Sequence, residues 1–149
     1  MLIMEKLQIQ VEALERKRSK WLIINLIGFC IWDGLRIIEN YVLVNTVSPL
    51  RTGVMLLGGL IWMVALIKLL RLGNDMKGNK YLVQILNDEL IELNRYKVWR
   101  ASLLMVILTQ VLIIIATFFV ADISGILAAE LSIFVFVTSA LGGFSYFNK

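Results

Sequence analysis

Histidine is absent from this sequence of 149 residues, and cysteine occurs once, at Cys30. These two absences exclude a disulfide within the chain, a metal site built from His and Cys, and a Ser-His-Asp triad. Carboxylate-only metal sites survive this exclusion, but the Asp and Glu residues show no spacing typical of one. Cys30 lies inside an apolar run and is best interpreted as a small buried side chain. We therefore expect no metal and no cofactor.

Charged residues are also few, at 17% of the chain, whereas 59% of the residues are hydrophobic. The apolar residues form four runs, each about as long as the ~20 helical residues that cross a bilayer. The runs are 21–47, 53–71, 99–120 and 123–147. About 50 residues remain outside them, too few for a separate soluble domain. The run at 21–47 is too long for a signal peptide and should stay in the mature protein. The sequence predicts an all-α integral membrane four-helix bundle.

The net charge of +4 is distributed unevenly. Basic residues precede the first run and fill the segment between the second and third runs, whereas the two short turns near 46–52 and 121–122 hold one basic residue, Arg51. The positive-inside rule then places both termini and residues 72–98 in the cytoplasm, with the chain in the cell inner, or cytoplasmic, membrane. Topology and contact with lipid headgroups explain the basic excess, so no directly bound nucleic acid is expected.

Two segments outside the runs are predicted to be cytosolic helices. Residues 1–20 form an amphipathic helix, and residues 72–98 form a turn at 73–75 and 78–79 followed by a helix from about residue 80 that can continue into the third run. Each helix has an apolar seam that could contact another helix of this chain, a second copy or a cytosolic protein partner. The first helix could alternatively lie on the membrane surface. The seams consist of Leu7, Val11 and Leu14, and of Leu82, Leu86, Leu90 and Leu93.

Polar side chains inside the apolar runs are the strongest candidates for a functional site, because charged groups in hydrocarbon are costly and are usually paired. At 100° per residue, five of them in the first run share an arc of about 120°. We expect Arg36 to pair with Asp33 and with Glu130 of the fourth run, which lies at a similar depth. Asp33 and Gln110 should both lie near the midplane and could bond. The predicted network comprises Asn25, Asp33, Arg36, Glu39, Asn40, Gln110 and Glu130.

The same polar network permits three interpretations. It can hold the helices together, it can line an ion path or a ligand pocket in an oligomer, or Asp33 and Glu39 can act as a catalytic carboxylate pair. The catalytic interpretation lacks any accompanying nucleophile or cofactor motif, so we do not expect an enzyme. Small residues at 58–59 and in the pattern small-x-x-x-small at 125–143 favour close helix contact and suggest the fourth run as an oligomer face.

A short motif before the third run resembles a pattern in small bacterial four-span membrane proteins. The motif is Asn87-Asp88-Glu89, then Leu93, then Lys97, with Leu90 where the family has Arg and Val98 where it has Ala. The match covers about twelve residues, and the family carries no known activity. The overall layout also resembles the four-span membrane subunits of phage-defence systems such as Kiwa. This resemblance implies a role in bacterial defence or stress response.

Two functions are compatible with these features. The first is a non-enzymatic, homo-oligomeric membrane scaffold or sensor that presents its cytosolic helices to a soluble partner. The second is a homo-oligomeric channel lined by the polar stripe of the first run. In a scaffold the stripe should be buried between helices of one molecule, and in a channel it should face a water-filled axis.

Overall fold

The computed structural model describes residues 2–42, 48–77, 89–119 and 123–147, and the regular structure in these ranges is helical. The four helices are α1 (Leu2–Tyr41), α2 (Pro49–Lys77), α4 (Glu89–Phe119) and α5 (Gly125–Phe147). Each is long and apolar enough to cross a membrane, as expected of a multi-pass membrane protein. The all-α prediction and the four apolar helices are thus confirmed.

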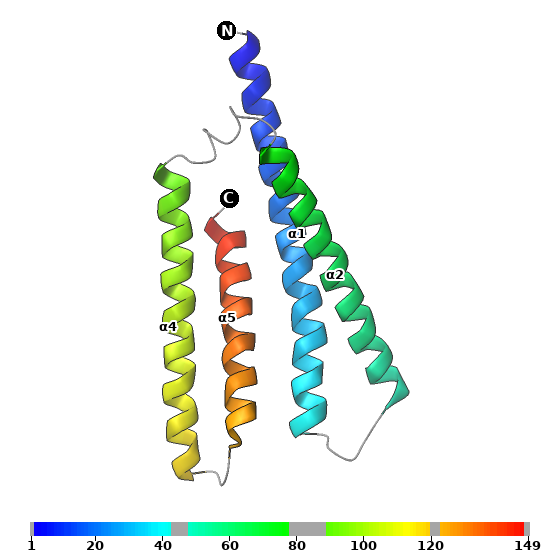
Figure 1. The fold of residues 1–149 in the computed structure, drawn as a ribbon, viewed down its shortest axis with the longest axis vertical. Helices are drawn as coiled ribbons and strands as arrows, with labels where there is room; N and C mark the ends of the chain where they lie inside the picture. The colour runs from blue at the N-terminus through cyan, green and yellow to red at the C-terminus, as the bar shows by residue number, and fades with distance from the viewer. Residues whose placement is uncertain (1, 43–47, 78–88, 120–122, 148–149) are drawn as a thin grey trace.

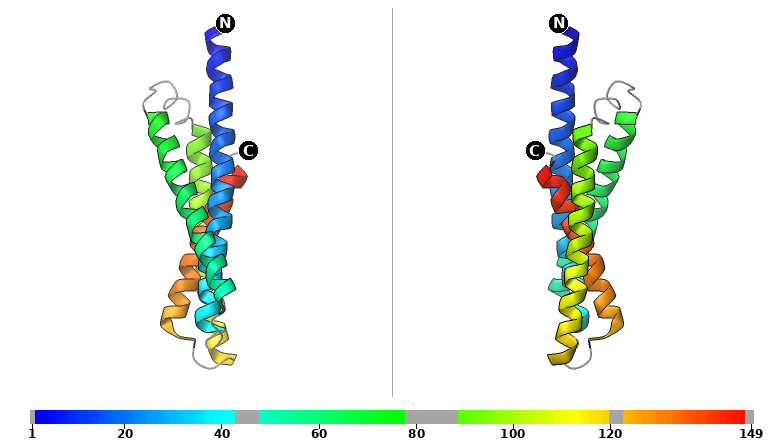
Figure 2. Two further views of the ribbon diagram at one scale, coloured as in Figure 1. Left: turned by 90° about the vertical axis from the view of Figure 1, so that its right-hand side faces the viewer. Right: turned by 90° about the vertical axis from the view of Figure 1, so that its left-hand side faces the viewer.

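The helices lie side by side in the order α2, α1, α5, α4 (Figure 1). Helix α1 packs against α2 and α5, and α5 packs against α4. The start of α1 and the end of α5 lie toward one end of the molecule, which we call the terminal end, and the end of α1 and the start of α5 lie toward the opposite, turn end. Seen from the side, α2 and α5 cross α1 obliquely (Figure 2). The arrangement is consistent with the predicted four-helix bundle, and it makes α1 and α5 the central pair.

Helix α1 is one unbroken helix of 40 residues. At about 1.5 Å per residue it is ~60 Å long, twice the thickness of a bilayer core. The predicted helix at 1–20 is therefore not a separate element but the direct continuation of the first span. Its first turns extend past the ends of the other helices along the axis of α1, rather than turning away to lie across them (Figure 2).

One predicted boundary differs in the structure. The predicted turn at 73–75 is wrong, because α2 continues through it to Lys77; one Gly inside a helix costs only about 1 kcal/mol, which neighbouring helical residues can offset. The turn at 78–79 and the seam residues Leu82 and Leu86 lie outside the described residues. From Glu89 the predicted helix does run without a break into the third span.

At the turn end, the first residues of α5 and α2 are of types that favour the start of a helix. Ser124 accepts a hydrogen bond from the backbone N–H of Leu127 at 3.2 Å, which satisfies one of the free donors in the first turn of α5. Pro49 is the first residue of α2, where its fixed φ suits a helix and its missing N–H costs nothing.

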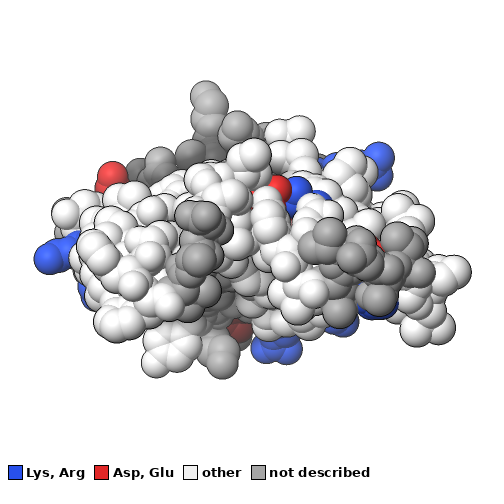
Figure 3. Space-filling view, turned by 90° about the horizontal axis from the view of Figure 1, so that it is seen from below, with Lys and Arg blue, Asp and Glu red and all other residues white. Residues whose placement is uncertain are grey.

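The described helices bury few apolar side chains among themselves. Buried apolar residues occur along the contact lines of the row, whereas most large aliphatic side chains of α2 and α4 face outward. Viewed from the turn end, the surface is mostly uncharged; an acidic group meets basic atoms near the middle, and other charged groups lie toward the edges (Figure 3). Such an apolar exterior is unusual for a soluble monomer and is typical of lipid-facing helices.

Candidate functional site

Glycines bring α1 and α2 into close contact. A Cβ atom built on Gly28 would lie 2.7 Å from the backbone N of Trp62, and one built on Gly58 would lie 2.6 Å from Cγ2 of Ile31. Only glycine permits this approach, which lets the Nδ2 group of Asn25 donate a hydrogen bond to the Trp62 carbonyl oxygen at 3.4 Å. The close contact predicted for the glycines at 58–59 is confirmed, and α1 supplies the partner glycine.

Aromatic rings fill the space beside this contact. Trp32 and Trp62 stack with centroids 5.0 Å apart and planes 10° apart. Phe29 lies 5.9 Å from Trp62 and stacks at 5.9 Å on Phe134 of α5. The rings therefore connect α2, α1 and α5 across the centre of the row. This aromatic cluster was not predicted from the sequence. The pattern that points to it there is the spacing of Phe29 and Trp32 by three residues.

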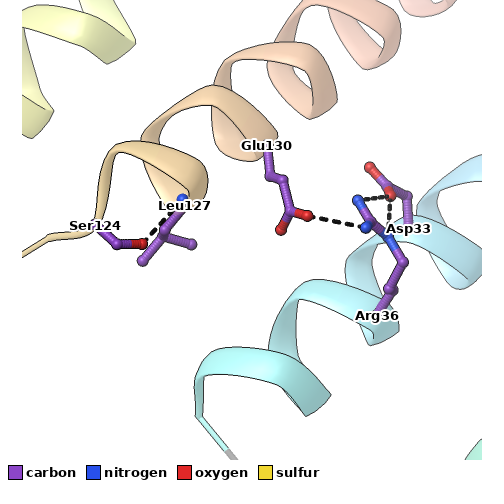
Figure 4. A network of polar contacts seen from close by, with 5 residues as sticks. All are labelled: Asp33, Arg36, Ser124, Leu127 and Glu130. Atoms are coloured by element: carbon purple, nitrogen blue, oxygen red, sulfur yellow. Dashed lines mark hydrogen bonds and ion pairs between the residues drawn. The ribbon is translucent and has the colours of Figure 1, made fainter.

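An ion cluster joins α1 to α5 nearer the turn end. The Nε and Nη2 groups of Arg36 both lie 2.8 Å from Oδ1 of Asp33, and Nη1 of Arg36 donates to Oε1 of Glu130 at 2.9 Å (Figure 4). The predicted pairing of Arg36 with Asp33 and Glu130 is confirmed. The planar guanidinium suits this role, because its donors reach two carboxylates at once.

The cluster lies only a short way inside the membrane-spanning length. Arg36 is five residues before the end of α1 and Glu130 is five residues after the start of α5, so both lie roughly 7–8 Å from the turn end at ~1.5 Å per residue. The side chain of Asp33 is 5% exposed and that of Arg36 is 35% exposed. The acid is therefore shielded by protein, while the guanidinium keeps a route toward the boundary.

The electrostatics of the cluster are unbalanced. Two carboxylates face one guanidinium, so the fully ionised cluster carries a formal charge of −1. Oε2 of Glu130 is buried and has no hydrogen-bond partner among the described residues. Tyr41, in the last turn of α1, lies within electrostatic range of Glu130 and Arg36. The arrangement can hold two helices together through charge-assisted hydrogen bonds.

The remaining predicted polar residues separate into two groups. Gln110 of α4 donates a short hydrogen bond through Nε2 to Oγ of Ser132 in α5. The suggested bond between Asp33 and Gln110 is therefore wrong, because α5 lies between α1 and α4. Glu39 is partly exposed and Asn40 is exposed, and neither belongs to the ion cluster.

The structure describes the side chains of only two of the predicted seam residues. The side chains of Leu7, Val11 and Leu90 are not among those that the structure describes. Leu14 is half-buried, and Leu93 is 50% exposed. Asn94, next to Leu93, donates through Nδ2 to the carbonyl oxygen of Phe147 at 3.3 Å and so links the start of α4 to the end of α5.

Among the residues that the structure describes, no group of three or more His, Cys, Asp or Glu residues could hold a metal ion. Comparisons with protein-family models, with curated proteins and with solved structures find no match to this chain.

Proposed function

We propose that this protein is a non-enzymatic membrane scaffold or sensor. It lies in the inner, or cytoplasmic, membrane of a bacterium with both termini in the cytoplasm, assembles with further copies of itself, and presents the projecting part of α1 to a cytosolic protein. A role in bacterial defence or stress response fits such a device. The orientation is supported by the basic residues, which gather at the terminal end of α1, α2 and α4.

The observation that carries this proposal is the continuity of α1. One helix contains both Asp33 and Arg36 of the ion cluster, near its turn end, and the turns that extend past the other helices. A helix transmits a displacement along its axis because its backbone hydrogen bonds run without interruption. A change at Asp33 or Arg36 can therefore move the cytosolic end of α1 by a comparable amount, which is the property that a membrane sensor needs.

The outward-facing aliphatic side chains of α2 and α4 support assembly into an oligomer. Examples are Leu56, Leu60, Leu104 and Leu108, each between 56% and 62% exposed. These rows face lipid in a single copy, and a second copy can replace lipid there at little cost because both surfaces are equally apolar.

The burial of the polar stripe favours a scaffold over the alternative, a homo-oligomeric channel. Asn25 is 3% exposed and Asp33 is 4% exposed within one copy of the chain. A stripe that lines a water-filled axis should be exposed on the surface of one copy. In this stripe only the outer part is exposed.

Site-specific photo-crosslinking tests the scaffold. A photoreactive residue at Ile9, which is 62% exposed on the projecting part of α1, should form adducts with a discrete soluble protein in native membranes. The same residue at Phe118, which is 81% exposed at the turn end of α4, is the matched control and should capture lipid or further copies only.

The channel is tested in parallel by ion flux into vesicles that contain the purified protein. The scaffold predicts flux equal to that of empty vesicles, for the natural chain and for Asp33→Asn alike. Identical adducts from both crosslinking positions, together with a monomer in mild detergent, would contradict the scaffold. Flux that Asp33→Asn alters would establish the channel instead.

A further inference from the structure

The four helices form two tightly packed hairpins, α1–α2 and α4–α5. In the first hairpin, a Cβ built on Gly28 would lie 2.7 Å from a backbone nitrogen of α2. In the second, a Cβ built on Gly143 would lie 3.0 Å from Cγ1 of Val98, and Asn94 and Gln110 of α4 both donate hydrogen bonds to α5. These contacts leave the two helices of a pair little freedom to move separately, so each hairpin is one rigid unit.

The contact between the hairpins, where α1 meets α5, is held differently. A ring contact and an ion pair join residues 29–36 of α1 to residues 130–134 of α5. Residues 12–28 of α1, by contrast, make no ring contact, hydrogen bond or ion pair with the described residues of α4 and α5. The specific contacts between the hairpins therefore lie in the part of α1 that is nearer the turn end.

The ring of Phe134 is the apolar part of this contact. It stacks on Phe29 with centroids 5.9 Å apart and planes 20° apart, and its edge would lie 3.7 Å from a Cβ built on Gly34. Because α5 crosses α1 obliquely, the two helices approach each other over a short length only (Figure 2). Apolar contact is not directional, so a small tilt of one helix against the other preserves most of it. We call these three residues the pivot contact.

The ion pair lies on the turn-end side of the pivot contact, and the bonds of Arg36 are unequal. Its Nε and Nη2 groups both lie 2.8 Å from Oδ1 of Asp33, whereas Nη1 alone reaches Glu130, at 2.9 Å. Asp33 belongs to the same helix as Arg36, so the bond to Glu130 can open while the guanidinium keeps a counter-ion. Opening therefore leaves one unpaired carboxylate, roughly 7–8 Å from the turn end, instead of two unpaired charges in hydrocarbon.

The position of the pivot contact makes α1 an unequal lever. Arg36 lies ~10 Å from Phe29 toward the turn end, whereas Ile9 lies ~30 Å from Phe29 toward the terminal end. Because α1 is one unbroken helix, a tilt about the pivot contact moves its two ends in opposite directions, and the terminal end moves about three times as far as the turn end.

We propose that the α1–α2 hairpin rocks on the α4–α5 hairpin about the pivot contact, and that the Arg36–Glu130 ion pair holds the closed position seen in the structure. The importance of this motion rests on the proposed function, because an amplified tilt of α1 is a signal that a cytosolic partner can detect.

Distances between spin labels, measured by double electron–electron resonance on the full chain in lipid nanodiscs, test the motion. The labels are attached to cysteines at exposed positions, in a background that carries Cys30→Ala. The turn-end pair replaces Ile38, which is 43% exposed, and Ile126, which is 70% exposed. The terminal-end pair replaces Ile9, which is 62% exposed, and Leu93, which is 50% exposed. Each pair joins α1 to the second hairpin.

Glu130→Leu removes the ion pair and keeps a side chain of similar size. The turn-end distance should lengthen by about 1–2 Å, the usual size of a helix shift, and the terminal-end distance should shorten by about 3–6 Å. The matched control, Gln110→Leu, removes a polar contact inside the second hairpin and should leave both distances unchanged. Glu130→Asp keeps the charge on a shorter side chain, guards against a variant that does not fold, and should give a smaller change in the same sense.

Four results would overturn the proposal. Unchanged distances in folded Glu130→Leu would show that the ion pair holds nothing closed, and equal changes in Gln110→Leu would show that the effect is not specific to it. Lengthening of both distances would show that the hairpins separate without rocking, and a change at the turn end alone would show that α1 bends. The labelled protein contains no cytosolic partner, so the outcome is independent of the crosslinking that tests the scaffold.

Discussion

A methyl group added at Gly28 would enter space that the backbone of α2 already occupies. The new Cβ of Gly28→Ala would lie 2.7 Å from the Trp62 nitrogen, 3.0 Å from the Trp62 Cα and 3.1 Å from the Gly58 carbonyl oxygen. All three atoms belong to the backbone, so no side chain can rotate to make room. The two helices must move apart, by about 0.7 Å if the nearest contact is to reach the 3.4 Å at which ordinary contacts begin.

The cost of this movement follows from what the contact holds together. Overpacking of this kind typically costs about 1–3 kcal/mol. The hydrogen bond from Asn25 to the Trp62 carbonyl is already 3.4 Å long, so the movement breaks it at a further cost of roughly 0.6 kcal/mol. The higher helix propensity of alanine offsets up to about 1 kcal/mol of this cost. We therefore expect Gly28→Ala to lower the free energy of unfolding by about 1–2 kcal/mol.

Gly53→Ala is the matched control, because nothing lies within 4 Å of a Cβ built on Gly53 of α2. This variant should be neutral or more stable by up to about 1 kcal/mol. Unfolding of both variants by SDS in mixed micelles, followed by far-UV circular dichroism, measures the difference. The near-UV signal of the Trp32–Trp62 stack should weaken in Gly28→Ala alone. Equal unfolding of the two variants would show that α1 and α2 do not approach at this distance.

Three further changes probe the other contacts by the same unfolding assay. Glu130→Gln should cost about 1–2 kcal/mol, less than a fully buried pair, because Arg36 is 35% exposed; a double-mutant cycle with Arg36→Gln that gave no coupling would contradict the pair. Ser132→Ala removes the acceptor of Gln110 and should cost roughly 0.6–1.7 kcal/mol, a loss that must vanish in the background of Gln110→Leu. Ser124→Ala removes the N-cap of α5 and should cost about 1 kcal/mol, whereas Ser124→Asp should preserve stability.

The helices were predictable from the sequence because the bilayer requires long apolar segments with all backbone groups paired internally. Their ends were less predictable. The continuation of α2 past Gly73 and the unbroken course of α1 through its basic residues depend on the absence of a strong helix breaker, and neither hydropathy nor charge reports this property. Boundaries drawn where polarity changes therefore marked the membrane limits rather than the helix ends.

The polar contacts were predictable only to the extent that depth determines them. Arg36 and Glu130 lie equally far from the turn end, and opposite charges at one depth inside hydrocarbon have few other partners. Asp33 and Gln110 also share a depth, yet they do not meet, because depth carries no information on which helices are neighbours. The order α2, α1, α5, α4 places Ser132 in front of Gln110 instead.

That order explains why the charged groups lie between α1 and α5. Helices joined by a short turn are held together by the chain and can pack through glycine and small side chains: Gly28 lies against Trp62 in the first hairpin, and a Cβ on Gly143 would lie 3.0 Å from Val98 in the second. Between the hairpins, a Cβ built on Gly34 would lie 3.7 Å from the ring of Phe134, which is an ordinary side-chain contact. Apolar contact alone discriminates poorly between partners in lipid, since lipid chains are as apolar as leucine. The Arg36–Glu130 pair supplies the discrimination that this seam otherwise lacks, because another pairing of the hairpins separates the Glu130 carboxylate from Arg36 inside hydrocarbon.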